Sequence, residues 1–181
     1  FTSNCATLTV GNAAAITGQP VNTTVCAGDN AVFTVTGSGT ISSYQWQVNT
    51  GAGFADMPGE TNPTLTLNAV TVSMNGYQYQ VNVFSCTAIP ITSSVATLTV
   101  NTPISISAQP VAAELCLGGN TSFSVTAAGT GIGYQWQYAA DCSSAWTNIP
   151  GATNATLNLN AVTLANAGAY RVVVSGTCNT V

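Results

Sequence analysis

The chain repeats itself at an interval of about 90 residues, and this repeat constrains its fold more than any other feature. Tyr44-Gln45-Trp46-Gln47 returns as Tyr134-Gln135-Trp136-Gln137, at an offset of 90. After a two-residue insertion, Asn68-Ala69-Val70 returns as Asn160-Ala161-Val162, at an offset of 92. A fixed period of this size is typical of an array of like domains. The 181 residues therefore predict two domains of similar size.

The position within the repeat at which the sequence starts and stops is informative as well. Residues 1–10 read FTSNCATLTV and resemble residues 91–100, ITSSVATLTV, which end the first complete repeat. The second repeat stops at Val181, just before the corresponding segment. We therefore expect residues 1–10 to be a spare last strand. It would belong to a preceding domain or be donated to a neighbouring copy.

Charged residues are nearly absent, which excludes several classes of partner. The chain has one Lys or Arg, five Asp or Glu and no His, while 46% of it is hydrophobic. A single basic side chain cannot form the positively charged surface that binds nucleic acid. No stretch approaches the roughly 20 apolar residues of a membrane helix. We expect neither nucleic-acid binding nor membrane insertion, and no cofactor.

Short alternating runs dominate both repeats. Val32–Thr36, Thr64–Leu67 and Tyr79–Val83 alternate apolar and polar residues and are rich in β-branched and aromatic types. Glycine-containing turn signals separate these runs. Only Val72–Asn75 and Leu164–Ala167 suggest short helical turns. The pattern predicts an all-β fold built from sandwiches.

Particular residues favour an immunoglobulin-like sandwich in each repeat. One Trp per repeat, Trp46 and Trp136, is placed to pack across the core, and Tyr79 and Tyr170 open the penultimate strand like a tyrosine corner. These four residues are predicted core anchors. The usual inter-sheet disulfide is missing, because its positions fall on aliphatic residues: Val35, Val81, Val125 and Val172.

On these residues the chain resembles the tandem immunoglobulin-like repeats of very large secreted bacterial surface proteins of the adhesin type. The resemblance lies in QPVNTTVCAGDNAVFTVTGSG, YQWQ, TLTLNAVT, MNGYQYQV and SSVATLTV, with their counterparts in the second repeat. It covers essentially the whole chain. It implies a spacer or stalk role, although a shared fold does not by itself supply a functional site.

Six cysteines in a chain without His favour disulfides and an oxidising exterior. Each repeat has two at corresponding places: Cys26 and Cys86, then Cys116 and Cys178. The simplest interpretation pairs them within each domain. The alternative joins neighbours, with Cys26 bound to Cys178, and Cys116 bound to Cys86 of the following copy. Strand geometry argues against the intradomain pairs, because their partners fall at opposite ends of a sandwich. The recurrence of two cysteines in each domain argues for them, and intradomain pairing is the expectation that we prefer.

Two further cysteines have no counterpart in the other repeat. Cys5 stands where the first repeat has Val95, and Cys142 lies in the insertion Asp141–Ser144. We expect a covalent link to another copy, because an exposed free thiol in an oxidising exterior is reactive.

Catalytic machinery is not apparent. The absence of His removes Ser-His-Asp and Cys-His arrangements, and the isolated acids offer no carboxylate pair and no calcium cage. We therefore expect no catalytic residue, no metal site and no enzyme activity. Three aromatic side chains without an obvious core role are candidates for stacking on a glycan, although cross-strand packing is the favoured explanation for them: Trp146, Tyr77 and Tyr138.

The sequence thus predicts three segments. Residues 1–10 are the spare strand, 11–100 form the first immunoglobulin-like sandwich, and 101–181 form the second without its last strand. The predicted function is the repeat unit of an extracellular filament or surface stalk, joined head to tail to neighbouring copies through residues 1–10. The alternative is an adhesin or carbohydrate-binding module at the cell surface.

Overall fold

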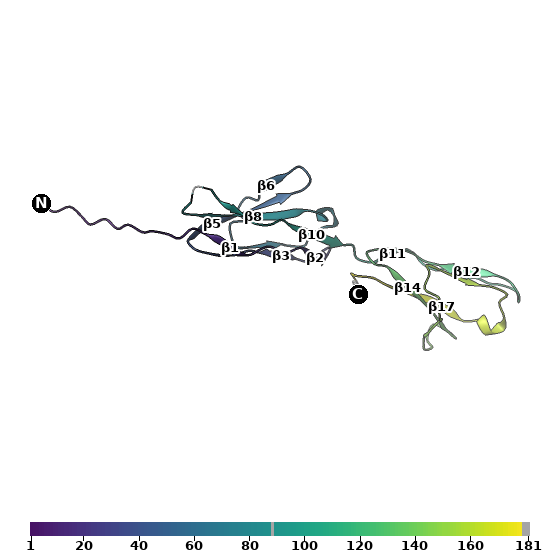
Figure 1. Cartoon of the computed structure of the whole chain (residues 1–181). Coiled ribbons are helices and arrows are strands. Elements are labelled where there is room, and N and C mark those ends of the chain that lie inside the picture. The colour runs from purple at the N-terminus through teal and green to yellow at the C-terminus, as the bar shows by residue number, and fades with distance from the viewer. Residues whose placement is uncertain (88, 179–181) are drawn as a thin grey trace. The chain divides into compact units, whose positions relative to one another are not determined.

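The computed structural model describes residues 1–87 and 89–178. The chain divides into two compact units, Phe1–Val100 and Asn101–Val181, and each is built almost entirely from strands (Figure 1). This confirms the predicted all-β class. The two short helical turns lie where the sequence placed them, as η1 (Val72–Met74) and η2 (Leu164–Asn166).

The first unit holds its main sheet in the order β2-β10-β8-β5-β6, with β9 also beside β8. The two remaining strand pairs are β3 with β7 and β1 with β4. The strands of this unit are β1 (Ala15–Gly18), β2 (Thr23–Cys26), β3 (Ala31–Thr34), β4 (Thr36–Ser38), β5 (Ile41–Asn49), β6 (Phe54–Asp56), β7 (Thr64–Leu67), β8 (Gln78–Ser85), β9 (Ile91–Thr92) and β10 (Ala96–Asn101).

The core of the first unit follows from the alternation of its strands. In β8 every second residue from Tyr79 is buried, because successive side chains of a strand point to opposite faces. Trp46 has no exposed surface, and its indole Nε1 donates to the carbonyl oxygen of Asn62 at 2.9 Å. The rings of Phe33 and Tyr79 stack with their centroids 4.8 Å apart. The positions of the usual inter-sheet disulfide, Val35 and Val81, are aliphatic core.

The second unit repeats this plan with shorter sheets. The strand order is β15-β14-β17, with β12 beside β16 and β11 beside β13. The strands are β11 (Ser105–Ala108), β12 (Thr121–Ser124), β13 (Thr126–Ala128), β14 (Gly133–Ala139), β15 (Thr147–Asn148), β16 (Thr156–Leu159) and β17 (Ala169–Ser175).

The same anchors recur in the second unit. Trp136 is fully buried, and its Nε1 donates to the carbonyl oxygen of Asn154 at 2.9 Å. The rings of Phe123 and Tyr170 lie 5.1 Å apart. The hydroxyl of Tyr170 donates to the carbonyl oxygen of Asn166 at 2.8 Å, which is the bond of a tyrosine corner.

Candidate functional site: the open edge of the second unit

In the first unit, β10 closes the main sheet by lying between β2 and β8. Its side chains alternate, so Ala96 and Leu98 have no exposed surface and Val100 is 5% exposed. All three belong to the hydrophobic core of this unit. A strand of the sequence Ala-Thr-Leu-Thr-Val therefore supplies one wall of the first sandwich.

The backbone of β10 is hydrogen-bonded along its length. Ala96 lies opposite Tyr79, and Thr97 lies opposite Gln78, in an antiparallel register. Beyond this pairing, the amide of Leu98 donates to the carbonyl oxygen of Tyr77 at 2.9 Å, and the carbonyl oxygen of Leu98 accepts from Gly76 at 2.8 Å. The strand therefore packs against the apolar side chains of β8 and also pairs with its main-chain N–H and C=O groups.

The second unit has no corresponding strand among its described residues. There β17 has β14 as its neighbour in the sheet and stands at the edge. The segment 111–116, which corresponds to the region of β2, adopts no strand. Leu115 and Leu117 are 48% and 69% exposed, whereas their counterparts Val25 and Ala27 pack against the core of the first unit.

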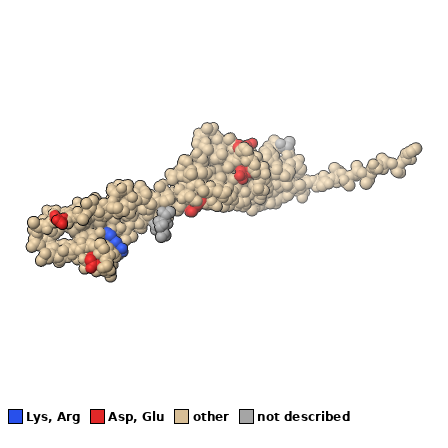
Figure 2. Space-filling model, turned by 180° about the vertical axis from the view of Figure 1, so that it is seen from behind, with Lys and Arg blue, Asp and Glu red and all other residues tan. Residues whose placement is uncertain are grey.

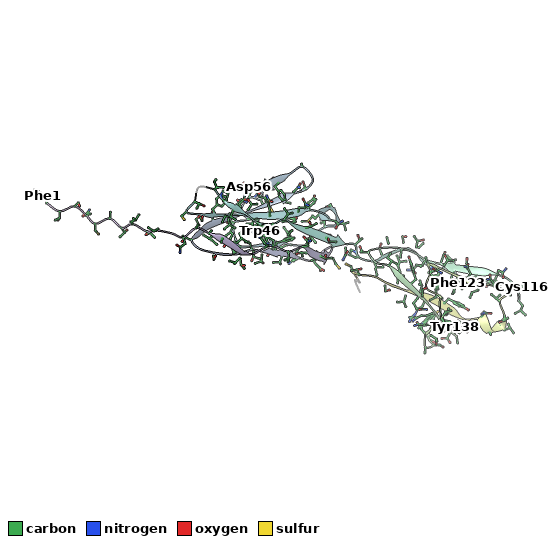
Figure 3. The ribbon with its side chains drawn as sticks, in the orientation of Figure 1. Phe1, Trp46, Asp56, Cys116, Phe123 and Tyr138 are labelled. Carbon is green, nitrogen blue, oxygen red and sulfur yellow. The ribbon has the colours of Figure 1, made fainter. Side chains whose placement is uncertain are left out.

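A groove occupies the place of the closing strand. It encloses about 300 Å³, and apolar side chains from the 113–117 segment, β12, η2 and β17 form most of its wall. The chief apolar residues are Leu115, Leu117, Phe123, Leu164 and Tyr170. Figure 3 shows Phe123 on the inner side of the unit and Cys116 in the loop at its end. Phe123 and Tyr170 are partly exposed, while their counterparts Phe33 and Tyr79 are 1% exposed.

Residues 1–10 form no strand within the first unit. They are exposed throughout and leave the sandwich as an extended trace (Figure 1). Leu8 is 89% exposed and Val10 is 83% exposed. Residues 6–10 have the same sequence as residues 96–100, whose apolar side chains are buried in β10.

The cysteines do not form the intradomain pairs that were the simpler expectation. Cys26 and Cys178 are each disulfide-bonded, whereas Cys86 and Cys116 are free, so neither predicted intradomain bridge exists. In the first unit the physical reason is the length of β8. The carbonyl oxygen of Cys26 accepts from Asp29, in a turn bonded to Val70 just before η1, and Cys86 follows the far end of β8. Eight residues at about 3.3 Å each far exceed the roughly 7 Å that a bridge spans.

Cys5 and Cys142 are also free and exposed. Cys142 lies in a turn organised by Asp141, whose carboxylate accepts from the amides and hydroxyls of Ser143 and Ser144 at 2.7–2.9 Å. These bonds lower the pKa of Asp141 to about 2. The insertion is thus an ordered surface turn, and the expected covalent link of Cys142 stays a prediction.

The three aromatic candidates for a glycan site do not form a common surface. Tyr77 packs against the core of the first unit. In the second unit the hydroxyl of Tyr138 donates to the carbonyl oxygen of Ala167 at 2.8 Å, and Arg171 stacks over the ring of Trp146 at 4.3 Å. Each side chain therefore already has a packing or hydrogen-bonding role within its unit.

Charge contributes little to either unit. Figure 2 shows isolated acidic groups and one basic group on the face drawn. The described residues contain no group of three or more His, Cys, Asp or Glu side chains able to hold a metal ion. Nor does any described helix have the length and apolar character needed to span a membrane.

Sequence reasoning missed two asparagines that support both units. Asn30 Oδ1 accepts from the amide of Ala69 at 2.9 Å, and Asn120 Oδ1 accepts from the amide of Ala161 at 2.8 Å. The two alanines have positive φ angles of 47° and 49°. Asn30 and Asn120 recur at the repeat offset of 90, and this recurrence was the available signal.

Comparison with known sequences gives two matches. Residues 105–181 match a family described as a domain of unknown function, DUF8696. The chain is also similar to Endoglucanase C of Cellulomonas fimi, with 34% identity over 174 residues that cover 94% of the chain. The chain spans only 16% of the length of that protein.

Solved structures with the same architecture are tandem immunoglobulin domains. The I-band fragment I67–I69 of titin has a TM-score of 0.67 at 16% identity, covering 94% of this chain and 62% of that one. Sidekick-1 immunoglobulin domains 1–5 have a TM-score of 0.64 at 15% identity, covering 94% and 38%. Identities this low establish the fold alone, and the chain consists of tandem immunoglobulin-like sandwiches.

Proposed function

We propose that this chain is the repeating structural unit of an extracellular filament or surface stalk, joined head to tail to further copies. The observation that carries the proposal is the repeated sandwich with a very short connection, because β10 ends at Asn101 and β11 begins at Ser105. Each unit has its own Trp and Tyr anchors and so can bear load through its own strand ladder. The function is mechanical and requires no catalytic group.

An extracellular location fits the chemistry of the chain. Cys26 and Cys178 are disulfide-bonded, and disulfides persist mainly in oxidising compartments. The proposal can be tested on intact cells that produce the chain, using antibodies raised against the first unit and electron microscopy. We expect labels at regular intervals along surface stalks. Labelling only after the cells are permeabilised would overturn the proposal.

The way in which copies are joined can be tested separately. Native material is run on a denaturing, reducing gel and probed with the same antibody. A band near 18.3 kDa indicates separate subunits, whereas one very large band indicates a continuous polypeptide array. Both results are compatible with a stalk, and they distinguish assembled from covalently continuous repeats.

A carbohydrate-binding module is the second candidate, because the chain is 34% identical to part of a protein named Endoglucanase C. The test is binding of the purified chain to an array of glycans that includes glucans. If Trp146 serves a glycan site, Trp146→Ala removes the binding. Phe54→Ala, at the corresponding place in the first unit, is the matched control. Retention of binding in Trp146→Ala would exclude that residue. Hydrolysis of a glucan by the purified chain would instead revive an enzymatic role.

A further inference from the structure

We propose that Arg171 is the centre of a binding site for the carboxylate of an acidic glycan, on the outer face of the sheet formed by β14, β15 and β17. The ligand is a polysaccharide that contains uronic acid. The inference rests on the second candidate function, glycan binding, and assigns to it a ligand class and the groups that hold the ligand. All of these groups belong to the second unit.

Arg171 lies on the face of the sheet that points away from the core. It is directly opposite Gln137 in the antiparallel pairing of β14 with β17. The neighbouring pair, Trp136 and Val172, is on the other face, because successive side chains of a strand alternate. Trp136 is fully buried, whereas Arg171 is exposed. The single Lys or Arg of the sequence therefore lies on the surface of the second unit.

A stacked ring and two hydrogen bonds hold the guanidinium of Arg171 in one orientation. Its Nε donates to Oε1 of Gln137 at 2.7 Å, and Nε2 of Gln137 donates in turn to Oδ1 of Asn148 at 2.8 Å. We call these two bonds the relay. The Cζ of Arg171 lies 4.3 Å from the centroid of the Trp146 ring. A planar group that is stacked and hydrogen-bonded in advance loses less freedom when it binds a ligand.

These contacts leave the two Nη groups of Arg171 available. Among the described residues, Arg171 has no ion-pair partner and no further side-chain hydrogen bond. Asp141 is the acid nearest to it in the sequence, and the Oδ1 of Asp141 accepts from Ser143 and Ser144 instead. The parallel N–H groups of a guanidinium match the two oxygens of a carboxylate. Arg171 therefore presents an oriented, unpaired set of donors to solvent.

The same relay occurs in the first unit with the opposite charge. There Gln80 Nε2 donates to Oε1 of Gln47 at 2.7 Å, and Gln47 Nε2 donates to Oδ1 of Asp56 at 2.8 Å. Strand register makes Gln80 the counterpart of Arg171 and Asp56 the counterpart of Asn148. The relay thus bears one negative charge in the first unit and one positive charge in the second. The hydrogen bonds are kept, and the sign of the ion that the surface attracts is reversed.

The aromatic ring beside the relay also differs between the units. Trp146 stands where the first unit has Phe54. Trp is the aromatic side chain that binds a cation best through its ring face. It follows directly on the insertion Asp141–Ser144, which the first unit lacks. The cation, its ring and the loss of the neighbouring acid therefore occur together at one place, as a site for an anion requires.

The groups around the guanidinium favour a sugar as the bearer of the carboxylate. Oδ1 of Asn148 accepts in the relay, and its amide nitrogen makes no hydrogen bond to a described residue. Nε2 of Gln135 donates to two main-chain carbonyl oxygens, which leaves its Oε1 as an acceptor. Sugar hydroxyls can pair with both kinds of group. Val173, two residues from Arg171 on the same face, is 43% exposed and offers an apolar surface to a pyranose ring.

A peptide is a poorer match for this surface. Extended peptides that bind a sheet add to its edge through main-chain hydrogen bonds. The groups described above are side chains on the face of the sheet, and β14 lies between β15 and β17. The favoured ligand is therefore a uronic acid within a polysaccharide chain.

The probes for this site are polygalacturonate and the same polymer after methyl esterification, which keeps the sugar backbone and removes the charge. Binding of the whole 181-residue chain is followed by tryptophan fluorescence and calorimetry. Trp46 and Trp136 are fully buried, so a change in emission reports chiefly on Trp146. We expect the acid form to bind roughly 10-fold or more tightly than the ester, and added salt to weaken the binding of the acid form.

Substitutions within the relay test each group. Arg171→Gln gives the second unit the residue of the first, so the relay can form without its charge, and binding of polygalacturonate should fall roughly 10-fold or more. Arg171→Lys keeps the charge without the planar fork and should bind between the two. Asn148→Asp restores the acid of the first unit and should also weaken binding. Both positions are exposed, so circular dichroism and melting should be unchanged.

The matched control moves the cation to the first unit. Arg171→Gln combined with Gln80→Arg keeps the net charge of the chain and places the guanidinium at the equivalent position. There the relay ends on Asp56, which offers the moved cation a carboxylate of the chain itself. We expect no recovery of binding. Recovery would overturn the site, because any exposed cation on this face would then suffice.

Three other results would overturn the proposal. The first is an ester that binds as tightly as the acid, and the second is Arg171→Gln binding as well as the wild type. The third is polyglutamate binding as tightly per carboxylate as polygalacturonate, which would make an acidic peptide the ligand. Neutral glucan binding that is equal in the wild type and Arg171→Gln keeps the glycan function and removes this site. Surface stalks that bind no glycan keep the structural role and remove both.

Discussion

The two units share a scaffold and differ at one edge. Tyr79, Val81 and Val83 of the first unit are at most 1% exposed, while Tyr170, Val172 and Val174 of the second are only partly buried. The difference does not come from the residues themselves, which are of the same types. It comes from the closing strand, which covers β8 and is missing beside β17 among the described residues. Burial in a sandwich is therefore decided by the neighbouring strand as much as by the strand's own sequence.

The size of this difference can be stated. Fully burying a Val or Leu side chain is worth about 1.5–3 kcal/mol. In the first unit β10 contributes the buried Leu98 and Val100. Among the described residues of the second unit, no strand makes the corresponding contribution beside β17. Substitutions at equivalent positions of the two units test this contrast.

The shared scaffold is tested most strongly at its Trp anchors. Trp46→Ala and Trp136→Ala should each destabilise their own unit by about 3–5 kcal/mol, because both indoles are fully buried and each donates a hydrogen bond. The measurement is urea denaturation followed by circular dichroism. Trp146→Ala, on the surface under Arg171, is the control and should cost less than about 1 kcal/mol. A small effect at Trp136 would mean that the second unit lacks a firm core.

The closing strand is tested by one substitution in two identical sequences. Leu98→Ala should destabilise the first unit by about 2–5 kcal/mol, because Leu98 has no exposed surface. Leu8→Ala should leave the unassembled chain unchanged within about 0.5 kcal/mol, because Leu8 is 89% exposed. Both are measured by urea denaturation at low protein concentration. Equal costs would show that residues 1–10 are already packed against a unit.

Alkaline pH should produce a smaller difference in stability between the two units. Burial, with a contribution from Tyr77, raises the pKa of Tyr79 to about 12 from its ordinary value of 10.0. A folded-state pKa above the unfolded one means that the stabilising contribution is complete below pH 10 and is lost as the pH rises toward 12. The first unit should lose stability across this interval. Denaturation curves at pH about 9 and about 11.5 measure the loss.

Tyr79→Phe is the control for the alkaline effect and should flatten the pH dependence of the first unit. The pKa of Tyr170 is also raised, mainly by burial and further by Tyr138, while its hydrogen bond to Asn166 acts in the opposite direction. Tyr170→Phe should likewise flatten the pH dependence of the second unit.

The smallest effect is expected where the units agree. Ala69 and Ala161 adopt positive φ angles of 47° and 49°, a conformation that costs any residue with a Cβ. Ala69→Gly and Ala161→Gly should each stabilise their own unit, by about 0.5–1 kcal/mol after the added entropy of Gly is counted. Thermal melting measures the gain. Thr99→Gly, in the extended backbone of β10, is the control and should destabilise.

Much of the fold could be predicted because its signals are local. Alternation predicts strands, and the recurrence of Trp46 and Tyr79 at Trp136 and Tyr170 predicts two sandwiches of one type. Residues 6–10 repeat residues 96–100 letter for letter, but they form no strand in the structure, so their interpretation as a last strand stays a prediction. The supporting role of Asn30 could not be read in this way, because its amide reaches Ala69 across the fold.

The strand pattern, the twofold repeat and the near absence of charge could all be read from the amino-acid sequence. These are properties of residues and their near neighbours along the chain. The three-dimensional fold was needed to show which cysteines are disulfide-bonded, which contacts Tyr138 and Trp146 make, and that apolar side chains line a groove beside β17. Each of these depends on which distant residues come within a few ångströms of one another, and that distance is fixed by packing.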